Sequence, residues 1–192
     1  MIEAELKARV TDPEQVYQRL AARAAERRSV YHDTYYDRPD HALTDAGREL
    51  RVRVMEQERR RRCLLTFKDA AVDQASGSKP EHETEIANPA TVDTILRALG
   101  LEPVIAFTKQ CANFTFDTDG RQVLATLVQV PELDGTWLEV ETLVEDQTDL
   151  ESALALVRRV LGELGIEEAD LTTELYTDTV AYQRADSGGA SG

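Results

Sequence analysis

The 192-residue sequence predicts an α+β fold in which an antiparallel sheet closes, or nearly closes, into a barrel with flanking helices. Apolar and polar residues alternate over about eight short segments, which is the period of half-buried strands. Helical patterns stand between groups of these segments, as in α+β proteins. The longest apolar runs contain only a few residues, so the sequence predicts no membrane-spanning segment.

The first part of the chain predicts two strands around one helix. Residues 2–10 alternate strictly between apolar and charged side chains, which predicts a strand. The run Asp12-Pro13-Glu14 then provides the cap and first turn of a helix, whose apolar stripe fades near Arg27. A second strand is expected over residues 31–37, followed by a loop that contains residues 45–47.

The middle of the chain predicts a hairpin and one further strand. Residues 49–56 alternate as a strand, residues 59–62 form the tip of the hairpin, and residues 63–69 form the returning strand. The stretch 71–80 is rich in Ala, Ser and Gly and is expected to be a loop, after which residues 81–87 form a strand.

The remaining segments predict three strands and three helices. In chain order they are a helix at 91–99, strands at 106–117, 122–130 and 136–143, and helices at 149–164 and 172–183. Residues 1–183 are expected to form a single domain, and the Ser- and Gly-rich tail 184–192 to be disordered.

The chain is acidic, with 36 Asp and Glu against 22 Lys and Arg and a net charge of −14. This balance argues against a general nucleic-acid binder, because such proteins neutralise phosphates with Lys and Arg. The charge is uneven, since residues 1–68 hold 15 basic and 12 acidic residues, whereas residues 69–192 hold 7 and 24. Cations gathered in one half of an acidic chain indicate a focused anion site.

The sequence also predicts where the protein resides. The N-terminus has no apolar region of the kind found in signal peptides. Cys63 and Cys111 form neither a disulfide framework nor a metal-binding spacing. We therefore expect a cytoplasmic protein, and the sequence leaves its oligomeric state open, with a homodimer as one option.

Five predicted strands carry ionisable or polar residues two positions apart, so each set lies on one face of its strand. The sets are Glu3/Glu5/Lys7, Arg51/Arg53, Thr66/Lys68, Glu83/Glu85 and Glu139/Glu141. Each set alone is typical of the solvated face of a half-buried sheet. Together, in a closed sheet, they favour a polar interior in which paired carboxylates bind Mg²⁺ or Mn²⁺ and the basic residues bind a multiply charged anion. A metal-bound polyphosphate satisfies both groups.

The same residues belong to an ordered series of motifs. The series is Glu3-Ala4-Glu5-Leu6-Lys7, HDTYYD at 32–37, GRELRVR at 47–53, LTFK at 65–68 and WLEVE at 137–141. It resembles the ExExK, DTYYD, G-x-x-LRxR, TxK and FxExE motifs of the CYTH superfamily, also called triphosphate tunnel metalloenzymes. This superfamily includes class IV adenylyl cyclases, thiamine triphosphatases and inorganic triphosphatases. The resemblance covers roughly residues 2–182.

The resemblance implies an eight-stranded antiparallel β-barrel whose tunnel binds a phosphate chain, and it implies roles for the charged residues. Phosphate oxygens would be bound by Lys7, Arg51, Arg53, Lys68 and Lys109. One or two ions of Mg²⁺ or Mn²⁺ would be held by Glu3, Glu5, Glu139 and Glu141, supported by Glu83 and Glu85. Lys7, at the terminal phosphates, and Glu5 are the catalytic candidates.

The second half of the chain departs from the family motifs. Cys111 stands where an arginine often follows Lys109, and Val128 stands where an acid is common. Glu81 occupies a position that is often basic, and the residues before Tyr176 also lack a frequent Lys or Arg. We therefore expect a different substrate, substrate orientation or metal count from the well-known members. A shorter phosphate chain or an organic diphosphate would need fewer cations.

The sequence thus predicts a divalent-metal-dependent phosphohydrolase acting on a triphosphate or on another small molecule that carries a polyphosphate or diphosphate. Two alternatives stay open. One is a class IV adenylyl cyclase, which makes cyclic AMP and pyrophosphate from ATP, and the other is a non-catalytic nucleotide- or polyphosphate-binding module. The expected partner is a phosphorylated small molecule, and neither nucleic acid nor a membrane is expected.

Overall fold

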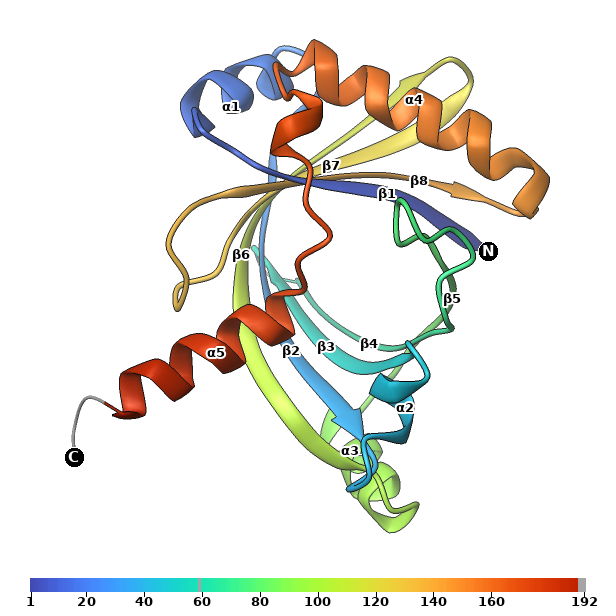
Figure 1. Cartoon of the computed structure of the whole chain (residues 1–192), viewed down its shortest axis with the longest axis vertical. Helices are drawn as coiled ribbons and strands as arrows, with labels where there is room; N and C mark the ends of the chain where they lie inside the picture. The colour runs from blue at the N-terminus through green and yellow to red at the C-terminus, as the bar shows by residue number, and fades with distance from the viewer. Residues whose placement is uncertain (59, 190–192) are drawn as a thin grey trace.

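The computed structural model describes residues 1–58 and 60–189 of the chain. Over these residues, eight antiparallel strands close into a barrel in the order β1-β5-β4-β3-β2-β6-β7-β8, with helices around it (Figure 1). This architecture confirms the predicted α+β fold. The strands are β1 (Ile2–Arg9), β2 (Arg27–Asp37), β3 (Glu49–Gln57), β4 (Arg60–Lys68), β5 (Lys79–Glu85), β6 (Glu102–Thr118), β7 (Arg121–Gln129) and β8 (Trp137–Val144).

The main hydrophobic core lies outside the barrel. Alternation along β1 sends one set of side chains outward, where they pack against helices α1 (Pro13–Ala21) and α4 (Leu150–Glu163), at the top of Figure 1. The outward residues of β1 are Ile2, Ala4, Leu6 and Ala8. The opposite face of the same strand therefore turns its charged residues toward the inside of the barrel.

A second apolar cluster fills part of the barrel interior next to β6, β7 and β8. Cys111 pairs with Val128, and Val128 pairs with Trp137, so these three side chains share one face of the sheet. The remaining members of the cluster are Phe107, Val130, Tyr176 and Val180. The inside of the barrel consequently has an apolar part and a charged part.

Several strands begin earlier than the sequence pattern predicts. β2 begins at Arg27 because α1 already ends at Ala21 and the following residues pair with β6. β6 begins at Glu102 and is 17 residues long, since it pairs with both β2 and β7. β4 begins at Arg60, so the expected hairpin tip is largely strand, and Arg59 of that tip lies outside the described residues.

Helix α2 (Ala42–Asp45) occupies a stretch that we expected to be a loop. The buried Asp37 carboxylate accepts hydrogen bonds from the N–H groups of Leu43 and Thr44, both at 2.9 Å. It also accepts one from the Thr44 hydroxyl at 2.6 Å. These hydrogen bonds stabilise α2, and they leave no periodic pattern in the sequence from which the helix could be predicted. The next helix, α3 (Pro89–Ala98), follows the predicted one closely and is capped by Asn88.

Helix α5 (Tyr176–Gly189) includes residues 184–189, which we expected in the disordered tail. Arg184 anchors this part of the helix, because its guanidinium donates to Glu132 at 2.7 and 2.9 Å and to the Ala106 carbonyl at 2.7 Å. Residues 190–192 of the expected tail lie outside the described residues. None of the helices in the described part of the chain is long and apolar enough to cross a membrane.

The segment before α5 runs along β1. Leu171 forms an isolated antiparallel bridge with Ala8, and the Thr172 N–H donates to the Lys7 carbonyl at 2.9 Å. The predicted helix from residue 172 is therefore wrong at its start, because the first residues are extended and paired with β1. This pairing brings the N-terminus of α5 to the inside of the barrel.

Candidate active site

The charged part of the barrel interior encloses a cavity of about 180 Å³. Its lining includes most of the candidates that the sequence indicates, and these candidates come from β1, β3, β4, β6 and β8. These are Glu3, Glu5, Lys7, Arg51, Arg53, Lys68, Lys109, Glu139 and Glu141. The inward face of five strands thus brings together residues that lie far apart in the sequence.

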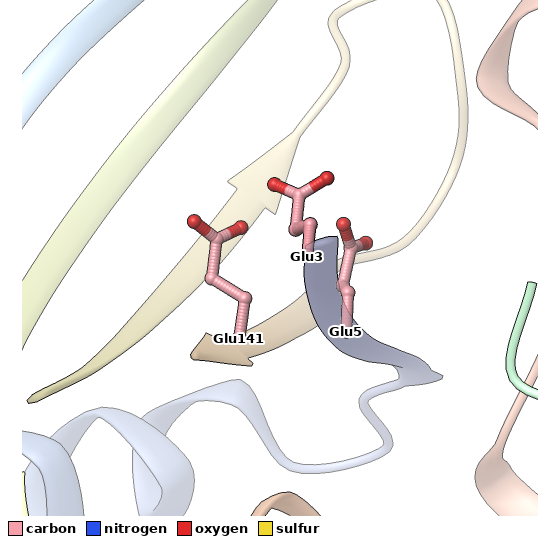
Figure 2. Close-up of side chains that lie close together, drawn as sticks. All are labelled: Glu3, Glu5 and Glu141. Atoms are coloured by element: carbon pink, nitrogen blue, oxygen red, sulfur yellow. The ribbon is translucent and has the colours of Figure 1, made fainter. Parts of the chain in front are cut away.

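Three carboxylates, from β1 and β8, form the acidic part of this cavity. Glu3, Glu5 and Glu141 each place an oxygen within 4.8 Å of the other two (Figure 2). The register explains the cluster, because Glu5 lies opposite Glu141 in the pairing of β1 with β8. We call these three residues the carboxylate cluster.

The members of the carboxylate cluster differ in pKa. Burial, together with the charges of Glu3 and Glu139, raises the pKa of Glu5 from 4.5 to about 7. Burial and the charges of Glu3 and Glu5 also raise the pKa of Glu141. Burial acts in the same direction on Glu3, but the Lys68 ammonium outweighs it and lowers the pKa of that carboxyl to about 2.

The donor set of the carboxylate cluster fits a divalent metal ion. Buried carboxylates that repel one another are stabilised by a cation, and oxygen-only donors suit Mg²⁺ or Mn²⁺. Glu139, which the family resemblance also implies as a ligand, lies outside the cluster. Its carboxylate is instead 3.2 Å from the Lys109 ammonium.

Two arginines from β3 contribute the next part of the site. Arg53 binds Asp33 with two nitrogens, at 2.6 and 2.7 Å, and this carboxylate is fully buried. Arg51 is held less completely: its Nη1 is 4.0 Å from Asp33 and its Nη2 is 3.4 Å from the Thr66 hydroxyl. Among the described residues, Arg51 Nε is buried and has no hydrogen-bond partner. Arg51 therefore keeps donor capacity for a ligand.

Three lysines complete the set of cations. Lys68 contacts Glu3 and lies 3.1 Å from Glu81 Oε2. Lys109 is paired with Glu139; burial opposes its charge, but that carboxylate raises the pKa of Lys109 above its usual value. Lys7 donates to the backbone carbonyl of Glu174, and burial lowers its pKa. Lys7 is thus bonded to a neutral group rather than to a carboxylate.

Glu83 and Glu85, the two supporting candidates, lie outside the cavity lining. Glu83 accepts a hydrogen bond from Thr66 at 2.9 Å, and Thr66 in turn contacts Arg51, so Glu83 can support that arginine. Glu85 pairs with Arg62 at 3.2 Å, with both side chains more than half exposed. An exposed pair of this kind contributes about 0–1 kcal/mol to stability. The structure therefore gives Glu85 no contact with the site.

Further residues belong to the site although the sequence did not single them out for it, and three of them contact the candidate residues. They are Asp33, Glu81 and Tyr176. Asp33 lies in the HDTYYD run, and the pairing of β2 with β3 would have indicated its position opposite Arg53. Tyr176 opens a helix and has no periodic signal that could have placed it inside a barrel. Its ring centroid lies 4.5 Å from the Lys7 ammonium and 4.0 Å from that of Lys109.

The departures from the family motifs gather in the apolar part of the interior. Cys111 and Val128 are 4% and 0% exposed and pack with Trp137. Burial raises the pKa of the Cys111 thiol to about 12, so this cysteine is a packing residue and not a nucleophile. At positions where the family often has charged residues, this chain has buried apolar side chains.

The fold and the site define a class of protein: a closed antiparallel barrel whose interior combines a carboxylate cluster with cations suited to phosphate. The model of the CYTH domain matches residues 1–176 of this chain. The chain therefore belongs to the CYTH domain family. Among curated proteins, none matches this chain.

Solved structures share the whole fold. The PH1819 protein of Pyrococcus horikoshii OT3 is 25% identical with a TM-score of 0.83, and the match covers 95% of this chain and 99% of that one. A Vibrio parahaemolyticus protein named as a candidate adenylate cyclase is 19% identical with a TM-score of 0.75, over 94% and 98% of the two chains. The Hippeastrum protein HpAC1, for which a dominant triphosphatase activity is described, is 18% identical with a TM-score of 0.64, over 97% and 96%.

Proposed function

We propose that the protein is a divalent-metal-dependent phosphohydrolase that acts on a triphosphate, or on another small molecule with a polyphosphate or diphosphate group. The observation that supports this most directly is that one cavity contains both the carboxylate cluster and the five candidate cations, together with Lys79. Carboxylates bind Mg²⁺ or Mn²⁺, and Lys and Arg bind phosphate oxygens. A metal-bound phosphate chain uses both sets of groups at once.

Glu3, Glu5 and Glu141 are the residues that would hold the metal ion. When bound, the ion would neutralise phosphate charge and polarise a phosphoryl oxygen. Lys7 lies two residues beyond Glu5 on the same face of β1, so it would contact the phosphate chain next to the carboxylate cluster.

The five cations would act in two ways. Within the part of the chain that the structure describes, Arg51 has an unpaired Nε and Lys7 is bonded to a backbone carbonyl, so these two would donate hydrogen bonds directly to phosphate oxygens. Arg53, Lys68 and Lys109 are each paired with a carboxylate and would contribute mainly through their charge. The reaction would be attack of water on phosphorus with cleavage of the bridging P–O bond, accelerated by positioning and charge neutralisation.

A cyclase and a non-catalytic binding module would use the same charged groups. A cyclase must also hold the ribose hydroxyl and the adenine. Val128, at a position where an acid is common in the family, packs here between Cys111 and Trp137. The loss of that acid favours hydrolysis over cyclisation.

One experiment separates the three functions. The purified protein is incubated with ATP, thiamine triphosphate, inorganic triphosphate and organic diphosphates, with Mg²⁺ or Mn²⁺, and the products are identified. We expect phosphate release that stops when the metal is chelated. Cyclic AMP with pyrophosphate would indicate the cyclase, and binding without turnover would indicate the module.

A matched pair of variants connects that activity to the carboxylate cluster. Glu5→Gln should reduce turnover by about 100-fold or more, because it removes one oxygen ligand and its charge from a buried site. Glu85→Gln changes the same side chain at an exposed position outside the cavity and should keep the activity of the wild type. An active Glu5→Gln protein would contradict the metal assignment.

A further inference from the structure

Helix α5 begins at the cavity with a polar group that the fold leaves unused. Among the described residues, the Tyr176 hydroxyl is buried and has no hydrogen-bond partner. The residue as a whole is 8% exposed, and its side chain borders the cavity beside Lys7 and Lys109. Buried polar atoms in native proteins nearly always have a partner, so this one points to a ligand.

Ring contacts hold the phenol of Tyr176 in place. The ring packs edge-on against Trp137, with centroids 5.4 Å apart, and lies 6.3 Å from the ring of Phe107. Two ammonium groups, from β1 and β6, lie 4.5 and 4.0 Å from its centroid. The hydroxyl is therefore fixed beside two cations at the border between the apolar and charged parts of the barrel.

The backbone at the same place offers further donors. The first turn of α5 is closed by a hydrogen bond from the Thr179 N–H to the Leu175 carbonyl. The preceding N–H groups, those of residues 176–178, have no acceptor within the helix. Leu175, Tyr176 and Thr177 all border the cavity, so the positive end of the helix dipole faces it.

We propose that the Tyr176 hydroxyl and the first turn of α5 form a subsite for the terminal phosphoryl group of the phosphate chain, beside Lys7 and Lys109. This inference rests on the proposed function and assigns one end of its substrate. The Glu139 carboxylate, which accepts a bond from Lys109 at 3.2 Å, lies close enough to the phenol to add to burial in raising the pKa of Tyr176, so a phosphoryl oxygen would compete with it for the hydroxyl. A phosphoryl oxygen would supply the partner that the hydroxyl lacks.

The subsite would also replace cations that the family motifs predict and that this chain lacks. Cys111 and Leu175 occupy or adjoin positions that are often basic in the family, and neither can bind phosphate by charge. Neutral donors, the phenol and the helix N–H groups, would take over this role. The terminal phosphoryl would then be bound with fewer fixed charges.

Isothermal titration calorimetry with inorganic triphosphate, in the presence of a metal chelator so that no hydrolysis occurs, tests the proposal. Tyr176→Phe keeps the ring and its contacts and removes only the hydroxyl, and we expect triphosphate to bind about tenfold or more weakly. Because the hydroxyl has no hydrogen-bond partner in residues 1–58 and 60–189, the Tm of this variant should equal or exceed that of the wild type. Tyr182→Phe makes the same change on the same helix at a residue that is 73% exposed, and its affinity should not change.

The outcomes distinguish the two proposals. If the wild type binds triphosphate and Tyr176→Phe binds it within about threefold, the subsite is wrong while the proposed function stands. A lower Tm for Tyr176→Phe would show that the hydroxyl is bonded within the fold, which also overturns the subsite. If the wild type binds none of the phosphate compounds, the proposed function fails, and the subsite fails with it.

Discussion

Asp33 shows how a single buried residue organises the cations of this site. Its carboxylate, fully buried in β2, accepts two bonds from Arg53 and lies 4.0 Å from Arg51. Burial alone would raise its pKa, but the two guanidinium groups outweigh burial and hold the pKa of Asp33 well below its ordinary value. The pair keeps Arg53 in a fixed orientation toward the cavity.

Removing this carboxylate should be costly. Asp33→Asn leaves the Arg53 guanidinium buried without its counter-charge, and we expect the free energy of unfolding to fall by about 3–5 kcal/mol. Unfolding by denaturant measures this loss of free energy of unfolding. Asp117→Asn, at an exposed position of β6, is the matched control and should change stability by less than about 0.5 kcal/mol. Equal stability of the two variants would show that the ion pair does not stabilise the fold.

The raised pKa of Glu5 predicts a pH dependence with a definite sign. The unfolded chain releases the Glu5 proton near its ordinary pKa of 4.5, whereas the folded, metal-free protein keeps it until about 7. Stability of the metal-free protein should therefore fall as pH rises across this window. Metal binding must displace the same proton, so Mg²⁺ affinity should rise with pH through this range.

Calorimetric titration of Mg²⁺ in two buffers with different ionisation enthalpies measures the protons released by the folded protein. Near neutral pH, the observed binding enthalpy should depend on the buffer, because Glu5 gives up its proton to it. Glu5→Gln should reduce that buffer dependence, and the pKa of Glu141, which burial also raises, accounts for what remains. The same enthalpy and affinity at acidic and neutral pH for the wild type would contradict the assignment.

At the scale of elements, pairing between strands decides which part of the interior is charged. β1 and β8 bring together the carboxylates, whereas β6, β7 and β8 bring together Cys111, Val128 and Trp137. The same strand, β8, thus carries an apolar residue at one end and two carboxylates further along its inward face. The segment before α5 is bonded to β1 and closes the interior beside both parts.

Restoring the family charges in this apolar part should reveal how it is packed. Cys111→Arg buries an unpaired charge, and we expect a loss of about 3 kcal/mol or more in the free energy of unfolding. Because Cys111 lies opposite Val128, adding Val128→Asp should recover part of that loss, with a coupling of about 1 kcal/mol or more. Additive losses in the double variant would show that the two side chains do not meet.

The same Cys111→Arg variant tests the expectation about the substrate. If this chain handles a shorter phosphate chain because it lacks a cation there, the added arginine should shift its preference among phosphate esters toward longer chains. A screen of mono-, di- and triphosphate esters measures that preference. An unchanged preference for a plain triphosphate in both forms would contradict the expectation.

Local alternation of apolar and polar residues predicted the strands, but it could not predict the short helix α2 or where α5 ends. β1 is correct to one residue because its period is unbroken from Ile2 to Arg9. The short helix α2 and the added turns of α5 depend instead on single side chains: Asp37, which accepts from residues six and seven positions on, and Arg184, which donates to the distant Ala106 carbonyl. Contacts of this kind carry no periodic signal.

At the scale of the whole molecule, the site was predictable in its residues but not in its arrangement. The i, i+2 pattern identified inward faces, and closure of the sheet directed those faces to one cavity. The pattern could not show that β5 brings Glu81 to Lys68 but leaves Glu85 exposed, since these residues share one strand face. How far along a strand the cavity extends depends on the curvature of the closed barrel.

The barrel as a whole places its apolar core on the outside and its charges within. Helices α1 and α4 cover the outer face of β1, so the interior does not have to supply the main hydrophobic stabilisation. This division allows the inward faces of several strands to carry buried charges that an ordinary core would exclude. The proposed function depends above all on the carboxylate cluster in this interior, which we expect to bind a divalent metal ion.

Equilibrium binding of Mn²⁺, followed by the loss of the electron paramagnetic resonance signal of the free ion, tests that expectation most directly. The wild type should bind Mn²⁺ with saturable stoichiometry, and Glu141→Gln should bind it about tenfold or more weakly, because it removes one of the three clustered carboxylates. Glu83→Gln, outside the cavity, should bind as the wild type does. Equal Mn²⁺ affinity of the wild type and Glu141→Gln would contradict the account.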